Sequence, residues 1–193
     1  MTGAHRAEPA DLADRPVAES TLAAATAALM RDLGGRIAAI LRPGDLLVLT
    51  GDLGAGKTTL VQGLGAALGV RGDITSPTFV IARVHPAVAE GPALVHVDAY
   101  RLGSLAEVDD LDLDASLAES ITVVEWGEGL VEDLAPDRLE IRLFRPHGAL
   151  GPDDAPQDGD EPRTVRLAGF GDRWAGVGLP SAGLPGQNPA QSC

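Results

Sequence analysis

Short apolar runs and stretches of helical periodicity alternate along the chain. Residues 46–50 (LLVLT) are continuously apolar over the length of a strand, a pattern typical of strands buried on both faces. Residues 57–68 (KTTLVQGLGAAL) carry apolar side chains at helical spacing and end at a glycine, so we predict a helix there. The same spacing runs through residues 19–41 (ESTLAAATAALMRDLGGRIAAIL), which predicts one helix with Ser20 or Thr21 as its N-cap.

Five further segments have the composition and pattern of strands. They are residues 77–84 (PTFVIARV), 93–98 (ALVHVD), 121–125 (ITVVE), 137–144 (DRLEIRLF) and 163–169 (RTVRLAG). The fourth alternates apolar and polar residues as a more exposed strand does, and we expect the fifth to pair with it. Strands that alternate with helices predict an α/β fold: a mainly parallel sheet flanked by helices, with a C-terminal antiparallel hairpin.

The polar segments set the expected domain boundaries. Residues 1–16 are polar and charged and predict a disordered leader, and residues 17–176 then form one domain. Residues 146–162 (PHGALGPDDAPQDGDEP) are rich in Pro, Gly and Asp, which predicts a flexible acidic loop inside that domain. Residues 177–193 are predicted to be a disordered tail.

Composition makes several classes of function poor candidates. The net charge of −13 repels phosphate backbones, which disfavours unaided nucleic-acid binding; the close basic trio Arg138, Arg142 and Arg145 is expected to be the solvated face of a strand. The single cysteine, Cys193, excludes an internal disulfide, and no Cys or His spacing suits a metal. With neither a secretory h-region nor an apolar run of transmembrane length, we expect a cytoplasmic protein.

One lysine stands out, because the chain has 15 basic side chains and only Lys57 is a lysine. It lies in the stretch 51–58 (GDLGAGKT), which fits the P-loop pattern G-x-x-x-x-G-K-[ST] between the predicted strand and helix. Glycines let backbone N–H groups curl around phosphate oxygens, the helix adds its positive end, and the lysine brings a compact charge. The residues expected to bind nucleotide here are Gly51, Asp52, Leu53, Gly54, Ala55, Gly56, Lys57, Thr58 and Thr59. The motif predicts a P-loop NTPase-like fold that binds a nucleoside triphosphate, but kinases, GTPases and ATPases all share it.

Two carboxylates end neighbouring predicted strands. Asp98 and Glu125 should both reach the carboxyl edge of the sheet, beside the phosphate loop. A P-loop enzyme needs an acid there to hold Mg²⁺, and a second acid can orient the attacking water. The residues alone do not assign the two roles, and either carboxylate can instead cap a following helix.

Several other side chains have two interpretations each. Ser76 and Thr78, in the block SPTF (76–79), either form a simple turn or reach a γ-phosphate. Arg101 either stabilises phosphate charge or pairs with the acidic stretch that follows. Trp126 either packs in the core or stacks near the nucleotide or a partner, and His96 is expected to be a packed strand residue.

Four blocks in order, GDLGAGKTT, SPTF, HVDAYR and VVEW, resemble the TsaE family, also called YjeE. The resemblance covers about residues 17–170. It implies a bacterial P-loop ATPase that uses ATP and Mg²⁺ and works with the proteins TsaB and TsaD. Together they make the threonylcarbamoyladenosine modification of tRNAs that read codons starting with adenine. TsaD transfers the group, and the ATPase permits multiple rounds, meeting tRNA only indirectly.

The resemblance also implies roles for residues. Thr58 and Glu125 become the Mg²⁺ ligands, Lys57 a phosphate-binding catalytic residue, Asp98 the catalytic or switch acid, and Ser76–Phe79 a second switch segment. Trp126 matches the tryptophan that the family has near the nucleotide. The family often has a tyrosine a few residues after SPTF, where this chain has His85.

Two other functions compete with the ATPase. One is a small-molecule P-loop kinase, although no arginine-rich lid is visible in the sequence. The other is a nucleotide-gated binding module in which hydrolysis is incidental. The absence of an N-K-x-D segment argues against an ordinary GTPase. With no evident arginine finger beyond Arg101, hydrolysis by the isolated protein is expected to be slow.

Overall fold

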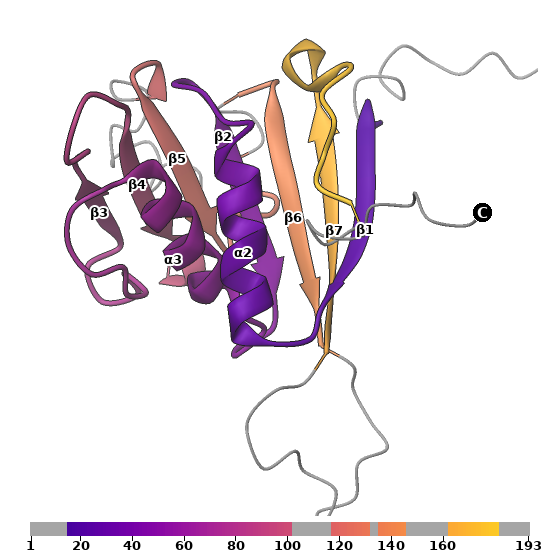
Figure 1. Ribbon diagram of the computed structural model, residues 1–193, viewed down its shortest axis with the longest axis horizontal. Helices are drawn as coiled ribbons and strands as arrows, with labels where there is room; N and C mark the ends of the chain where they lie inside the picture. The colour runs from indigo at the N-terminus through magenta and orange to yellow at the C-terminus, as the bar shows by residue number, and fades with distance from the viewer. Residues whose placement is uncertain (1–14, 102–116, 132–134, 146–161, 182–193) are drawn as a thin grey trace, which may run out of the picture.

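A computed structural model describes residues 15–101, 117–131, 135–145 and 162–181 of the chain. These residues form one seven-stranded sheet with two helices (Figure 1). The strands are β1 (Ala18–Ala24), β2 (Leu46–Gly51), β3 (Ala82–His85), β4 (Ala93–Asp98), β5 (Ser120–Glu125), β6 (Arg138–Phe144) and β7 (Arg163–Phe170). The helices are α2 (Ala27–Ala38) and α3 (Lys57–Leu68), and short 3-10 turns follow β4 (Ala99–Arg101) and β7 (Asp172–Trp174).

The sheet is parallel in its centre and antiparallel at both edges. Its strand order is β1-β7-β6-β2-β5-β4-β3. Strands β6, β2, β5 and β4 run parallel, whereas β3, β7 and β1 each pair antiparallel with their neighbours. The predicted α/β class and the β6–β7 hairpin are therefore confirmed.

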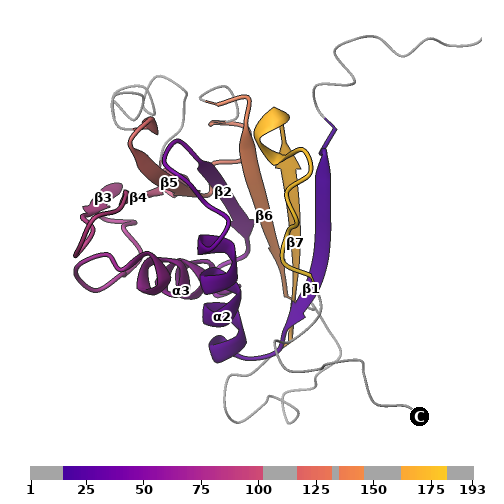
Figure 2. The same ribbon diagram turned by 45° about the horizontal axis from the view of Figure 1, so that its top comes forward.

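Both helices cover the same face of this sheet (Figures 1 and 2). The larger hydrophobic core lies between them and the strands, where Leu47 and Leu49 of β2 point. Alternate residues of the same strand, Leu46 and Val48, face a smaller cluster on the other side. Since β2 is buried on both faces, it forms a rigid support for the loop that follows it.

Two glycines let α2 and α3 touch backbone to backbone. A Cβ atom on Gly34 of α2 would lie 2.3 Å from the carbonyl oxygen of Leu60, and one on Gly63 of α3 would lie 2.0 Å from that of Arg31. No larger residue fits this crossing without moving one helix. The position of α3, and hence of Lys57 at its start, depends on this contact.

The helix predicted over residues 19–41 was wrong in its N-terminal part, residues 19–26. Residues Ala18–Ala24 form β1, which pairs along its whole length with β7, and the helix begins only after Thr26. The Oγ1 atom of Thr26 accepts a hydrogen bond from the N–H of Leu29 at 3.1 Å, as an N-cap does. The strand has alternating burial, so pairing with β7, whose residues lie 139 to 151 positions further along the chain, overrides the local helical pattern.

The strand predicted over residues 77–84 is also shorter than expected. The N–H groups of Val80 and Ile81 both bond to the carbonyl of Pro77, and β3 begins only at Ala82. Ile81 has a φ of 68°, which a regular strand does not allow. The segment 76–81 is therefore a turn that projects from the edge of the sheet.

Strand β6 is more buried than its alternation suggested. It lies between β2 and β7, and Leu139, Ile141 and Leu143 are almost fully buried. Arg138 is not solvated, since its side chain is buried, bonds to Glu140 at 3.0 Å and lies over the ring of Phe170.

The chain after the last strand returns to the core. Val177 and Leu179 pack against the larger hydrophobic cluster, although they belong to the predicted tail. The hydroxyl of Ser20 in β1 donates to the carbonyl oxygen of Pro180 at 2.6 Å. The rest of that tail, the leader through residue 14, the acidic loop 146–161 and most of the acidic stretch after Arg101 lie outside the described residues.

A buried ion pair fastens the C-terminal segment to the start of β2. The guanidinium of Arg173 donates two hydrogen bonds of 2.8 Å to the carboxylate of Asp45 and one of 2.7 Å to the carbonyl of Ile40. Both charged side chains are buried, at 8% and 3% exposure. No helix among the described residues is long and apolar enough to cross a membrane.

Candidate functional site

The loop between β2 and α3 has the backbone that the P-loop pattern requires. Gly51, Gly54 and Gly56 adopt φ angles of 144°, 77° and 105°, a region that residues with a Cβ rarely enter. A Cβ on Gly51 would also lie 2.5 Å from the carbonyl oxygen of Leu143. The fully buried Ala55 donates its N–H to the carbonyl of Asp52 at 3.1 Å, which closes the loop.

Lys57 is held at the mouth of this loop. Its ammonium donates to the carbonyls of Gly51 at 2.7 Å and Asp52 at 3.1 Å, and it lies 4.0 Å from the ring centroid of Trp126. Burial lowers the pKa of Lys57 below the ordinary 10.5, while the carboxylates of Glu125, Asp98 and Asp52 act against that shift. The site therefore holds a partly desolvated ammonium among carboxylates, and a polyanionic ligand would be attracted to this cation.

Thr58, Glu125 and His96 form a connected group beside the lysine. The hydroxyl of Thr58 donates to Oε1 of Glu125 at 3.1 Å, and Nε2 of His96 lies 2.9 Å from the same oxygen. Glu125 and His96 are both buried, and they lie on the neighbouring parallel strands β5 and β4, where Glu125 is aligned with Asp98 and His96 with Val123. The half-buried hydroxyl of Thr58 and the buried carboxylate of Glu125 together form a pair of oxygen donors.

Asp98 ends the neighbouring strand and is bound on both oxygens. Oδ2 accepts hydrogen bonds from Thr78 at 2.5 Å and Ser76 at 3.1 Å, and Oδ1 accepts from the N–H of Tyr100 at 3.0 Å. The two hydroxyls also lie 2.6 Å from each other. The turn 76–81 is thus fastened to the carboxyl edge of the sheet through Asp98, whose backbone N–H also donates to the carbonyl of Ile81 at 2.8 Å.

Trp126 follows Glu125 in a backbone conformation unusual for its residue type. Its φ is 61°, and its N–H donates to the carbonyl of Leu49 in β2 at 2.9 Å. Its ring meets Tyr100 edge to face, with centroids 5.4 Å apart. The ring lies over the Lys57 ammonium, beside the loop. Stacking of Trp126 near a nucleotide or a partner stays a prediction.

These groups line one cavity of about 230 Å³. Its lining residues are Leu53, Gly54, Gly56, Lys57, Thr58, Thr59, Ser76, Thr78, Asp98, Glu125 and Trp126. Of the predicted site residues, only Gly51, Asp52 and Ala55 are absent from this lining, and the first two supply the carbonyls that bind Lys57. The structure brings the predicted residues together, while their chemical roles stay predictions.

Two contributors had no role in the sequence analysis. His96 was expected to be a packed, hydrogen-bonded residue, and its partner, which the sequence did not indicate, is the carboxylate of Glu125. Tyr100 supplies both the N–H bound by Asp98 and the ring beside Trp126. An aspartate that ends a strand often accepts the N–H two residues on, and this local rule points to Tyr100. Arg101 lies over the exposed ring of Phe79, with 5.0 Å between its guanidinium and the ring centroid.

The donor set fits Mg²⁺ bound together with a phosphate. The described residues contain no group of three or more His, Cys, Asp and Glu side chains that could enclose a metal. Magnesium does not need one, because it takes one or two protein oxygens and completes its shell with phosphate and water. The Thr58 hydroxyl and the Glu125 carboxylate are oxygens of this kind.

Comparison with known proteins gives consistent matches. A family model described as threonylcarbamoyl adenosine biosynthesis protein TsaE matches residues 24–149. The tRNA threonylcarbamoyladenosine biosynthesis protein TsaE of Streptomyces coelicolor is 60% identical over 147 residues, covering 76% of this chain and 94% of that protein. The protein of the same name from Bacillus subtilis is 35% identical over 139 residues, covering 71% and 77%.

A solved structure agrees. The crystal structure of Bacillus subtilis YdiB superposes with a TM-score of 0.58 at 28% identity, covering 81% of this chain and 89% of that one. Since the family model spans well over half of the sequence, the chain belongs to the TsaE family of tRNA threonylcarbamoyladenosine biosynthesis proteins.

Proposed function

We propose that the protein binds and hydrolyses ATP as a subunit required for threonylcarbamoyladenosine modification of tRNA. The observation that carries this proposal is the single cavity into which Lys57, the Thr58–Glu125 pair and Asp98 all point. A cation, an oxygen donor pair and a separate buried acid are the parts that phosphoryl transfer to water needs.

Each group has a distinct task in this proposal. The loop 51–56 and Lys57 bind the phosphates, and Thr58 and Glu125 hold Mg²⁺, which when bound neutralises charge on the phosphate oxygens. Asp98 orients the attacking water, and Ser76 and Thr78 hold Asp98 in place. Trp126 covers the ammonium and limits its contact with solvent.

The partner assignment follows from the family. We propose that the protein acts in the cytoplasm on a complex of TsaB and TsaD and lets that complex turn over many times. With a net charge of −13, this chain is a poor surface for tRNA, so the tRNA would be held by the partners.

One observation favours a second candidate, the nucleotide-gated binding module. Asp98 already accepts three hydrogen bonds, two from the turn 76–81 and one from Tyr100. A carboxylate so occupied can organise a turn around bound ATP without activating water. The two candidates differ in what happens when Asp98 loses its charge.

Two variants separate the candidates. In a calorimetric titration with ATP and Mg²⁺, Lys57→Ala should lose at least about tenfold in affinity, since a charge-assisted contact to phosphate is removed. Asp98→Asn should keep ATP affinity but lose about 10²-fold or more in turnover, the usual cost of a missing general base. Unchanged turnover of Asp98→Asn would favour the module, and unchanged affinity of Lys57→Ala would contradict the whole site.

The partner role needs a reconstitution. The modification assay contains TsaB, TsaD, tRNA and the threonylcarbamoyl donor, with and without this protein and ATP. We expect many rounds of product per complex only when this protein and ATP are both present. Multiple rounds with Lys57→Ala in place of the wild type would exclude an ATP-dependent role.

A further inference from the structure

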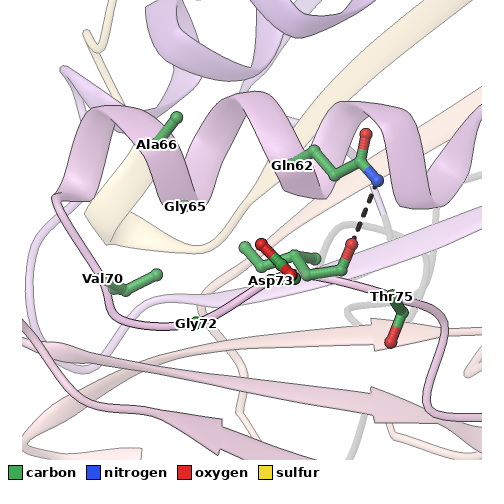
Figure 3. Close-up of a pocket in the computed structure, with 8 residues that line it drawn as sticks. Gln62, Gly65, Ala66, Val70, Gly72, Asp73 and Thr75 are labelled. Carbon is green, nitrogen blue, oxygen red and sulfur yellow. Dashed lines mark hydrogen bonds between the residues drawn. The ribbon is translucent and has the colours of Figure 1, made fainter.

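A glutamine on α3 reaches across to the loop that precedes the site. The side-chain amide of Gln62 donates a hydrogen bond of 3.0 Å to the carbonyl oxygen of Ile74. Figure 3 shows this amide directed from the helix to the loop, which also carries Asp73 and Thr75. Gln62 lies one helical turn after Thr58, so both side chains lie on the same side of α3.

The loop leads directly into the groups that hold Asp98. Ile74 is two residues before Ser76 and four before Thr78, whose hydroxyls both donate to the Asp98 carboxylate. Gln62 therefore connects the helix that begins at Lys57 with the turn that fastens Asp98. The connection runs through one hydrogen bond and two peptide units.

Other contacts hold this part of the loop from elsewhere: Ile74 is buried in the larger hydrophobic core, and the guanidinium of Arg83 in β3 donates to Oγ1 of Thr75 at 3.3 Å. Its beginning is tied to the chain after β3, where Arg71 donates to the carbonyl of Pro86 at 2.8 Å. Among the residues that the structure describes, the bond from Gln62 is the one hydrogen bond that joins α3 to residues 72–75. The Ile74 side chain packs against Gly65, but a cavity of about 470 Å³ separates much of the loop from the helix (Figure 3).

We propose that Gln62 is a positioning residue that keeps the 76–81 turn in register with the phosphate loop. The inference rests on the proposed ATPase function, because the register matters only if Ser76 and Thr78 respond to the terminal phosphate. Gln62 is outside the lining of the nucleotide cavity and acts through Ile74. Loss of this hydrogen bond leaves the phosphate loop intact but loosens the 76–81 turn, which in this proposal responds to the terminal phosphate and so distinguishes ATP from ADP.

Three substitutions at one position test this. Gln62→Met keeps the length but loses the donor, and Gln62→Glu replaces the donor with an acceptor that the carbonyl repels. Gln62→Lys restores a donor of sufficient reach. Ala66→Ser is the matched control, since Ala66 lines the same cavity one turn further along α3 without taking part in the bond.

Two measurements are made on the full-length protein. The first is the ratio of affinities for a non-hydrolysable ATP analogue and ADP, by calorimetry with Mg²⁺. For Gln62→Met and Gln62→Glu the ratio should fall up to about tenfold with ADP affinity kept, which is the most that one hydrogen bond supplies. Gln62→Lys and Ala66→Ser should match the wild type.

The second measurement is amide hydrogen exchange without nucleotide. Residues 72–80 should exchange faster in Gln62→Met and Gln62→Glu, while β2 and α3 keep the wild-type rates. Wild-type exchange in 72–80 together with a wild-type affinity ratio would overturn the proposal, as would an equal loss of ADP and analogue affinity. If the wild type itself binds no nucleotide, the proposed function fails, but the exchange comparison still decides whether Gln62 holds the loop.

Discussion

Lys57 shows how the fold holds a charged side chain in a buried, partly desolvated position. Two backbone carbonyls satisfy its N–H groups, and the aromatic face of Trp126 lies 4.0 Å away. Burial still lowers its pKa, because the carboxylates of Glu125 and Asp98 offset the desolvation only in part. The lysine consequently loses its proton at lower pH than a lysine in solution.

This shift has a measurable effect on binding. A folded-state pKa below 10.5 means that the unbound ammonium begins to deprotonate before an ordinary lysine does. Phosphates favour the charged form, so ATP affinity should decline as the pH rises toward 10.5, and binding there should take up a proton. Calorimetry in buffers of different ionisation enthalpy measures both effects.

The matched variant is Lys57→Arg. Its guanidinium does not titrate in this range, so whatever affinity it retains should be flat with pH. A wild-type affinity independent of pH, or the same decline in the arginine variant, would show that the lysine proton is not involved.

At this scale the sequence predicted what is local. The glycines and Lys57 form a motif whose geometry follows from adjacent residues, and the structure reproduces it. The contact between His96 and Glu125 was not predicted, because the two residues are 29 positions apart in the sequence and meet only through the pairing of β4 with β5. The positive φ of Trp126 likewise has no local signal, since tryptophan does not favour that region.

At the scale of elements, the crossing of α2 and α3 positions the site. Gly34 and Gly35 are neighbours in α2 with different surroundings. A Cβ on Gly34 would meet the α3 backbone at 2.3 and 2.7 Å, whereas one on Gly35 would lie 3.8 Å from the methyl of Ala67. The same substitution therefore has opposite effects at adjacent positions.

Gly34→Ala should destabilise the fold by about 1–3 kcal/mol, because the helices must move apart. Gly35→Ala should be neutral or stabilise by up to about 1 kcal/mol, since alanine is the better helix former and the space is free. Urea denaturation of both variants gives the two free energies of unfolding. Equal values would mean that the helices adjust without cost.

Some element boundaries are set by neighbouring residues and could be predicted, whereas others are set by residues distant in the sequence and could not. Helix α3 was predicted at both ends, because the loop glycines start it and Gly69, with φ 65°, stops it. Strand β1 was missed, since alanine-rich residues 19–24 suit either structure and only β7 decides between them. The next strand was predicted to begin at residue 77, whereas β3 begins at Ala82, because the hydroxyls of Ser76 and Thr78 bind Asp98 and the turn continues to Ile81.

At the scale of the whole molecule, Arg173 and Asp45 join parts 128 residues apart in sequence. Asp45 also accepts the N–H of Arg42 at 2.9 Å, so the pair fixes the turn that leads into β2. Nothing in the sequence around either residue marks them as partners. Their burial makes the pair far more sensitive to mutation than a surface ion pair.

Arg173→Met should lower the free energy of unfolding by about 3–5 kcal/mol, because Asp45 would remain buried with only the exposed guanidinium of Arg42, 4.0 Å away, as a cation. The control is Arg166→Met, which removes an exposed pair with Glu19 and should cost about 0–1 kcal/mol. Denaturant titration measures both. A small effect at Arg173 would mean that water reaches Asp45 and replaces the lost hydrogen bonds.

The chain's basic side chains are arginines apart from Lys57, and this has a consequence for covalent chemistry. Apart from an α-amino group, the molecule has one amine, and that amine lines the cavity in which we propose that nucleotide binds. Reductive methylation with isotopically labelled formaldehyde would place one side-chain label in the whole protein, at the point where phosphates are proposed to bind. Acetylation of lysine has the same single target and would remove the charge there. In most proteins a lysine-directed modification is spread over many surface sites, whereas here it would modify only Lys57, in the proposed nucleotide site.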